Sequence, residues 1–376
     1  MFSEYNFKNL NFRLLFYALA LNAIGLLVIN SAVNGDRSYI NRQLIGLFGG
    51  LVIMLFLALT DYHKLMRCTG VIYLGCVVIL LAIIVAGQFG GAGTGARRWI
   101  TLPVIGRFQP SEFVKIGLII FFSWFLQRNQ ERINNLRTLI IVGAFAAVPL
   151  LLIMKQPDLS TSIVIVFIIV CLIFVAGLSY KWIVGAAAVG IPGLGLTVFL
   201  AEHGAVPFLT GYQVNRILAF INPGKYADLN VQQDNSKMAI GSGMLYGKGL
   251  LNETAISVKN GNFLSEEHTD FIFAVIGEEM GFVGCMLVLI LYLLFVFECL
   301  RMAGRTRDLT GKLLCTGIAA LVGFQAFTNI AVATGIFPNT GLPLPFISYG
   351  VSSLVSLYIG IGVLLNVGLQ QNKLEF

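Results

Sequence analysis

The sequence is poor in charged residues. Asp, Glu, Lys and Arg make up 11% of the 376 residues, against roughly a quarter in an ordinary soluble domain. Hydrophobic residues make up 57%, and the mean hydropathy is +0.84. So little polar surface cannot cover a chain of this length, and the composition excludes a water-soluble globular protein.

Metal-ligand and nucleic-acid signals are also scarce. The six cysteines form no CxxC pair, and His63, His203 and His268 are too scattered for a structural zinc site. We interpret the cysteines as small core residues. The net charge of +7 comes from basic residues beside apolar stretches, without the runs or interleaved aromatics of a nucleic-acid groove. No nucleic-acid partner is predicted.

Apolar stretches long enough to cross a bilayer recur along the whole chain. They predict an all-α polytopic membrane protein, a single domain over 1–376 with about ten transmembrane helices. The first span lacks a small-residue cleavage site behind it, so we expect it to remain as an anchor. The expected spans are 13–32, 43–60, 69–87, 111–127, 138–154, 159–177, 181–200, 270–299, 311–334 and 347–369.

The distribution of basic residues sets the orientation. With the N-terminus inside, inner segments carry thirteen Lys and Arg and short outer segments carry seven, so both termini are predicted to be cytoplasmic. The outer face then receives 88–110, 336–345 and a large loop, 201–269, between the seventh and eighth helices. These segments should converge there, with short interfacial helices in the large loop.

Ionisable residues at membrane spans are costly, so each one suggests a function. Asp270 lies where the polar loop meets the eighth span, and partial desolvation there would suit a general base. The alternative is that Asp270 and Thr269 only cap this helix. Glu278 and Glu279, two turns further on, must face protein, water or a cation.

Other charged residues have both a functional and a purely structural interpretation. Glu112 and Lys115 are three apart and can form an ion pair on one helix face. Asp158 can cap the sixth span or pair with Lys155. The outer arginines offer forked donors to an anion, or anchor helices at phospholipid headgroups, and Trp99 can be an aromatic-belt residue. These arginines are Arg97, Arg98, Arg107 and Arg216.

Five motifs in one order resemble the SEDS family of membrane proteins, the RodA, FtsW and SpoVE group that builds bacterial cell wall. The resemblance spans nearly the whole chain. It implies a ten-helix fold and transfer of a growing glycan onto lipid II at the outer face of the cytoplasmic membrane, and the family's essential loop aspartate falls on Asp270. The motifs are GARRWITLPVIGRFQPSEFVKI at 95–116, QPDLSTSI at 156–163, YQVNRILAFINP at 212–223, HTDFIFAVIGEEMGF at 268–282 and TGLPLPFISYG at 340–350.

The resemblance also implies a mechanism. Asp270 would deprotonate the 4-hydroxyl of lipid II or help to hold a cation, and an undecaprenyl-pyrophosphate-linked glycan would be the donor in an inverting displacement. Outer arginines and Mg²⁺ or Mn²⁺ would balance the donor charge, without an organic cofactor. Glu112, Lys115 and Asp158 would shape the cavity. The other residues of the motifs are Trp99, His268, Thr269, Glu278, Glu279 and Ser348.

The family further implies a class B penicillin-binding protein as partner. Departures from its pattern are Val351 in place of a glycine, Glu266 in place of a proline, and Ser160 in place of a glycine. The long RRWI and FQPSE stretches look more like the RodA, elongation-type branch. Two other functions compete: a flippase that moves lipid II without making a bond, and a non-enzymatic scaffold for a transpeptidase. The dense polar cluster at the outer mouth disfavours a transporter, which usually binds at the membrane midplane.

Overall fold

The computed structural model describes residues 10–86, 98–102, 106–202, 211–251, 264 and 266–370. Each of the ten predicted spans corresponds to one long helix, and the helical membrane fold is confirmed. Six helices are long and apolar enough to cross a bilayer, and two shorter apolar helices accompany them. The ten helices are α1 (Phe12–Ala32), α2 (Arg37–Ala58), α4 (Thr69–Ala86), α5 (Pro110–Arg128), α6 (Leu136–Lys155), α7 (Leu159–Val175), α8 (Tyr180–Glu202), α11 (Ile272–Arg305), α12 (Leu309–Ala333) and α13 (Val351–Leu369).

Short elements connect these helices. The large loop of the sequence prediction contains α9 (Gly211–Ile221) and α10 (Ala227–Ser242), while α3 (Tyr62–Arg67) and the 3₁₀ turn η2 (Gln130–Arg132) lie in other connections. Before α5, the strands β1 (Ile100–Leu102) and β2 (Gly106–Phe108) pair antiparallel, with Thr101 opposite Arg107. This hairpin is a small departure from a purely helical chain.

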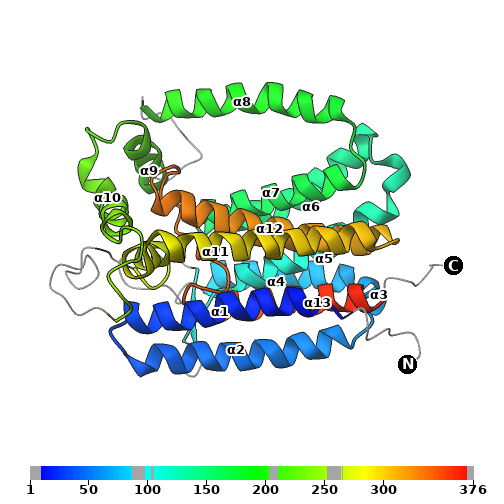
Figure 1. Ribbon diagram of the computed structural model, residues 1–376. Helices are drawn as coiled ribbons and strands as arrows, with labels where there is room; N and C mark the ends of the chain where they lie inside the picture. Colours follow the sequence, from blue (N-terminus) through cyan, green and yellow to red (C-terminus); the bar gives the residue numbers. More distant parts are fainter. Residues whose placement is uncertain are drawn as a thin grey trace.

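The long helices run side by side (Figure 1). The start of α1 and the end of α13 lie at one end of the bundle, and α9 and α10 lie at the other. Helix α8 lies apart from α6 and α7 along most of its length. It contacts the rest of the chain at its start, where Trp182 Nε1 donates to Asn134 O at 3.2 Å, and at its end, where it packs against α9. We refer to the end that carries α9 and α10 as the outer end, following the orientation predicted from charge.

The most buried helices are α12 and α13, which form the centre of the bundle with α5. Helix α2 packs along α13, and glycines permit this close approach. A β-carbon at Gly50 would lie 2.8 Å from the Tyr358 ring, and one at Gly46 would lie 3.0 Å from Val351 Cγ1. Val351 is therefore accommodated because Gly46 opposite it has no side chain.

Helix α11 is broken near its outer end. Gly281 adopts φ 63°, a conformation that favours glycine. The segment 244–249 supplies the backbone partners that the break exposes: Lys248 N donates to Glu278 O at 2.9 Å, and Phe282 N donates to Met244 O at 2.9 Å. The outer piece of α11 is thus held in place without a continuous helical ladder.

Two helix starts differ from the sequence prediction for local reasons. Helix α2 begins at Arg37 rather than 43 because Asp36 caps it, accepting from Ser38 N at 2.8 Å. Helix α13 begins at Val351 rather than 347 because the preceding residues form a turn, in which Ser348 Oγ accepts from Leu344 N at 2.8 Å. That turn contributes directly to the candidate site.

Candidate active site

Asp270 lies on a turn, 266–271, that leads into α11. Its backbone is fixed to α12 and to the 342–349 segment, because three consecutive carbonyl oxygens each accept a hydrogen bond from them. The donors are Asn329 Nδ2 to Asp270 at 2.8 Å, Ser348 Oγ to Thr269 at 2.6 Å and Tyr349 N to His268 at 2.9 Å. The turn is therefore rigidly placed.

The alternative that Asp270 and Thr269 cap α11 is wrong. The N-cap position belongs to Phe271, which makes no side-chain cap bond, and Thr269 Oγ1 instead donates to Glu266 O at 3.2 Å. Asp270 is half-buried. Within the described part of the chain, no hydrogen bond or ion pair engages its carboxylate oxygens, so they remain available to a ligand.

The surroundings of Asp270 shift its protonation. Burial raises the pKa of its carboxyl from 3.8 to about 6. The nearby charge of Glu266 raises this pKa further and that of Asp158 adds a smaller increase, whereas Arg216 and Arg98 lower it. The side chain is thus poised to gain or lose a proton near neutral pH, as a general base requires.

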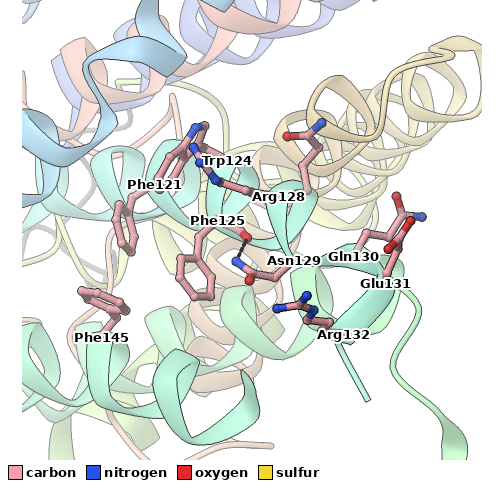
Figure 2. A pocket seen from close by; sticks show the side chains of 10 residues that line it. Phe121, Trp124, Phe125, Arg128, Asn129, Gln130, Glu131, Arg132 and Phe145 are labelled. Atoms are coloured by element: carbon pink, nitrogen blue, oxygen red, sulfur yellow. Dashed lines mark hydrogen bonds between the residues drawn. The ribbon is translucent and has the colours of Figure 1, made fainter. Parts of the chain in front are cut away.

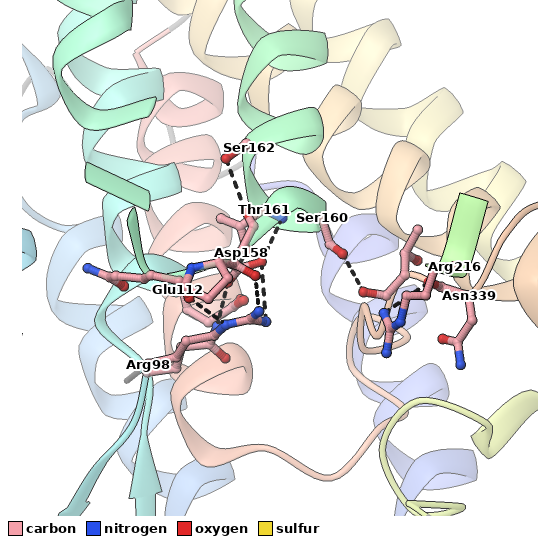
Figure 3. A network of polar contacts seen from close by, with 12 residues as sticks. Arg98, Glu112, Asp158, Ser160, Thr161, Ser162, Arg216 and Asn339 are labelled. Carbon is pink, nitrogen blue, oxygen red and sulfur yellow. Dashed lines mark hydrogen bonds and ion pairs between the residues drawn. The ribbon is translucent and has the colours of Figure 1, made fainter. Parts of the chain in front are cut away.

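Arg216, from α9, fixes the segment beside Asp270. Its Nη1 donates to Asn339 O at 2.9 Å, and Ser160 Oγ at the start of α7 donates to the next carbonyl along (Figure 3). Gly341 follows with φ 70°, and a β-carbon there would lie 3.1 Å from Asp270 Oδ2 and 3.9 Å from Arg216 Nη1. The absence of a side chain at Gly341 therefore keeps the space beside the carboxylate open.

Asp158 was predicted either to cap a helix or to form an ion pair, and it does both. Its carboxylate caps α7, accepting from Thr161 N at 3.1 Å. Arg98 Nη1 also lies 3.7 Å from Asp158 Oδ1, so the ion pair forms with Arg98 rather than with the exposed Lys155. Arg98 donates in addition from Nε to Gln156 O at 2.9 Å and from Nη2 to the carbonyl of the following proline. Figure 3 shows this network.

The predicted pair of Glu112 and Lys115 is confirmed. Lys115 Nζ donates to Glu112 Oε1 at 2.8 Å, and the two residues are 1% and 3% exposed. Both come from the outer part of α5. In a buried pair of this kind, each charge compensates the other inside the bundle.

Glu278 and Glu279 have partners of their own. Lys248 Nζ lies 2.7 Å from Glu278 Oε1, and Ser31 Oγ at the end of α1 donates to Glu279. These contacts connect the broken part of α11 to α1 and to the segment after α10. The two glutamates thus face protein, in agreement with the expectation that they face protein, water or a cation.

The remaining predicted residues surround the mouth. Arg107 is exposed on β2, and Trp99 is half-buried next to β1. The His268 ring contacts those of Tyr39 and Tyr349, with centroids 5.2 and 5.7 Å away. Burial lowers the pKa of His268, Glu266 opposes this effect and Arg107 adds to it. Arg97 lies outside the described residues.

Several site residues were not singled out from the sequence, although two of them, Gly341 and Tyr349, lie within the quoted motif at 340–350. The others are Asn329, Lys248 and Tyr39. Asn329 had a usable signal, because a buried amide within an apolar helix needs partners just as a carboxylate does. Its Nδ2 also donates to Leu342 O at 2.7 Å. The other four become visible only when segments distant in sequence are placed together.

The described residues contain no group of three His, Cys, Asp or Glu side chains able to hold a metal. They do place two carboxylates, Asp270 and Glu266, within electrostatic reach of each other. Mg²⁺ is commonly held by one or two carboxylates together with substrate phosphates. Asp270 and Glu266 are of the chemical type that could ligate such a cation.

A bundle of about ten membrane helices, with Asp270, Asp158, Arg98 and Arg216 brought near one another at one end, defines a class of integral membrane protein. Residues 12–373 match the family model of the FtsW, RodA and SpoVE proteins, described as cell cycle protein. A probable peptidoglycan glycosyltransferase FtsW from Geobacter sp. (strain M18) is 33% identical, with 94% of this chain and 95% of that protein covered. The chain belongs to the FtsW, RodA and SpoVE family, known as SEDS.

Other similarities agree with this membership. The peptidoglycan glycosyltransferase MrdB of Escherichia coli (strain K12) is 33% identical, with 96% of this chain and 94% of that protein covered. RodA from Thermus thermophilus aligns with a TM-score of 0.69 at 26% identity, covering 99% of each chain. A chain from a peptidoglycan synthase complex that coordinates polymerization and crosslinking aligns with a TM-score of 0.79 at 28% identity, also covering 99% of each. FtsW and MrdB relatives are similarly distant, so the RodA-type branch stays a prediction.

Proposed function

We propose that this protein polymerises the glycan strands of peptidoglycan from lipid II, at the outer face of the cytoplasmic membrane. Its relatives over nearly the whole chain are named peptidoglycan glycosyltransferases. The observation that carries the residue assignment is the carboxylate of Asp270, held on a fixed turn, unpartnered within the described residues and with a pKa raised to about 6. Both termini would lie in the cytoplasm.

Asp270 is the proposed general base. The acceptor is the 4-hydroxyl of lipid II, and its oxygen attacks the anomeric carbon of the undecaprenyl-pyrophosphate-linked glycan. Asp270 takes the hydroxyl proton, the new glycosidic bond forms, and the bond to the pyrophosphate oxygen breaks from the opposite face. The anomeric centre is inverted, and the leaving group keeps its electron pair and departs on the lipid carrier.

Positive charge near Asp270 suits such a leaving group. Arg98 and Arg216 both lower the pKa of Asp270, so their positive charges act on the site and would favour a phosphate there. A Mg²⁺ or Mn²⁺ ion bound with the pyrophosphate would supply further charge neutralisation. Helping to hold that ion is the alternative role of Asp270, in place of the role of general base. The ion pair with Asp158 and the hydrogen bond to Gln156 O fix the position of the Arg98 side chain.

A class B penicillin-binding protein is the proposed partner. The structural neighbour from a peptidoglycan synthase complex combines polymerization with crosslinking, which supports pairing with a crosslinking enzyme. With the orientation predicted from charge, α9, α10 and the β1–β2 hairpin would lie on the side where a periplasmic domain is found.

The decisive experiment measures polymer formation by the purified protein with its partner, lipid II and Mg²⁺ or Mn²⁺, with products separated on a gel. Asp270→Asn should abolish polymer formation while folding and partner binding persist. The matched control is Asp234→Asn, which removes an exposed carboxylate from the same outer region, where its ion-pair partner among the described residues is Lys237 at 2.6 Å. It should polymerise normally.

The outcomes separate the competing functions. Polymer from wild type and Asp234→Asn but not from Asp270→Asn supports a glycosyltransferase that depends on Asp270. Equal polymer from all three rejects Asp270 as the base. If no folded protein forms polymer, lipid II movement in vesicles tests the flippase, and partner transpeptidase activity tests the scaffold.

A further inference from the structure

A pocket lies at the opposite end of α5 from the candidate active site. Four aromatic side chains and two arginines dominate its lining (Figure 2). We call it the inner pocket, after its place at the predicted cytoplasmic end of the bundle. These residues are Phe121, Trp124, Phe125, Phe145, Arg128 and Arg132.

The aromatic residues form a preorganised floor. The Phe121 and Phe145 rings have centroids 5.2 Å apart, and those of Phe125 and Phe145 are 5.6 Å apart, both in edge-on contact. Tyr73 OH donates to Phe145 O at 2.9 Å, which fixes α6 against α4. Asn129 Nδ2 donates to Phe125 O at 2.8 Å and closes the end of α5.

The rim is basic. Arg128 stacks over Trp124, with its Cζ 5.7 Å from the ring centroid, so its guanidinium is oriented by a cation–π contact. Arg128 and Arg132 are exposed. Among the described residues neither takes part in an ion pair, and Glu131 is the single acidic residue in the lining. The rim therefore carries an excess of positive charge.

The depth of the pocket suits an amphipathic ligand. Arg128 marks the helix end and Phe121 lies seven residues further in, or about 10 Å along α5 at 1.5 Å per residue. This is about the distance from a lipid phosphate into the upper acyl region. The first turns of neighbouring α6 expose Leu136 and Ile140, 58% and 61% accessible, as expected for a surface in contact with lipid.

We propose that the inner pocket binds an anionic phospholipid. Arg128 and Arg132 would contact the phosphate, and the start of an acyl chain would lie on the half-buried Phe125 and Phe145. Phe121, only 4% exposed, supports this floor by packing against Phe145. A soluble phosphate would use the arginines but leave the aromatic floor exposed to water. A zwitterionic lipid could also place an acyl chain on the floor, but the cation in its headgroup would be repelled by the positively charged rim. Only an anionic lipid satisfies both parts of the pocket.

The test uses native mass spectrometry of the purified full-length protein, titrated with phosphatidylglycerol or with phosphatidylcholine of the same acyl chains. The double variant Arg128→Gln/Arg132→Gln should bind phosphatidylglycerol about tenfold more weakly, since it loses two charge-assisted contacts. The matched control, Arg305→Gln/Arg307→Gln, removes two exposed inner arginines outside the pocket and should bind within about twofold of wild type.

Two further arms distinguish the chemistry. Phe125→Ala should weaken phosphatidylglycerol binding, because it removes part of the floor. Glycerol 3-phosphate should not compete, because it lacks acyl chains. The proposal is overturned if the two double variants lose binding equally, if phosphatidylcholine binds as well as phosphatidylglycerol, or if glycerol 3-phosphate displaces the lipid. Thermal melting of each variant within a few degrees of wild type confirms that the comparison involves folded protein.

Discussion

Asn329 donates from one nitrogen to the backbone carbonyls of Asp270 and Leu342, at 2.8 and 2.7 Å. A single buried side chain of α12 thereby fixes both the turn that carries the proposed base and the loop that leads to Gly341. The position of the carboxylate depends on a residue that does not itself face the reacting groups.

Replacing this side chain should therefore reduce polymerisation. We expect Asn329→Leu to lower the rate at least tenfold, since it frees the Asp270 turn and leaves two buried carbonyls unpaired. Initial rates of lipid II polymerisation measure the effect. The control is Asn22→Leu, a similarly buried asparagine of α1 whose Nδ2 lies 3.5 Å from Tyr358 OH. Equal rate losses in both variants would mean that Asn329 only supports the fold.

Gly341 should be intolerant of any side chain. A β-carbon would lie 3.1 Å from Asp270 Oδ2, and the backbone at φ 70° disfavours other residues. We expect Gly341→Ala to reduce polymerisation strongly. The control is Gly335→Ala, also at positive φ (80°), where the new β-carbon would meet the flexible Lys237 side chain at 2.9 Å instead of the carboxylate. If both variants lose similar activity, backbone strain rather than occlusion is responsible.

The buried pair on α5 should be more sensitive to losing one partner than to losing both. Glu112→Gln or Lys115→Met alone leaves an uncompensated charge and should destabilise the protein by about 3–5 kcal/mol. The double variant Glu112→Gln/Lys115→Met should recover part of this loss. Thermal unfolding in detergent measures the coupling. Additive losses in the double variant would show that the 2.8 Å contact contributes little.

Sequence reasoning succeeded where the relevant contacts are local. The ten spans follow from runs of apolar residues, and the pairing of Glu112 with Lys115 follows from their three-residue spacing. The cap formed by Asp158 also follows from its place before an apolar run. Each of these features depends on residues a few positions apart, so spacing alone contains the information.

Contacts between distant segments could not be predicted in the same way. Glu278 was expected to need a partner, but only the fold identifies Lys248, 30 positions away. Asn329 is 59 positions from Asp270. The break at Gly281 and the hairpin before α5 could not be predicted either, because hydrogen bonding between backbone groups depends little on which side chains are present. The site is formed largely by contacts between segments that are distant in sequence.

The pH dependence of polymerisation should report on Asp270. A general base must be ionised, and the pKa of Asp270 is raised to about 6. The rate should therefore fall below about pH 6, approaching a tenfold loss per pH unit, and level off above it. Burial also lowers the pKa of the nearby His268. His268→Gln should retain the same acidic limb, whereas loss of the limb in that variant would assign it to the histidine.

The neighbours of Asp270 allow a stricter test, because their charges move its pKa in opposite directions. Glu266 raises this pKa, so Glu266→Gln should shift the acidic limb of the pH profile to lower pH. Arg216 lowers it, so Arg216→Gln should shift the limb to higher pH. A substrate group titrating in free solution would give the same midpoint in both variants. Opposite shifts therefore assign the titrating group to Asp270, while shifts of the same sign would place the essential proton elsewhere.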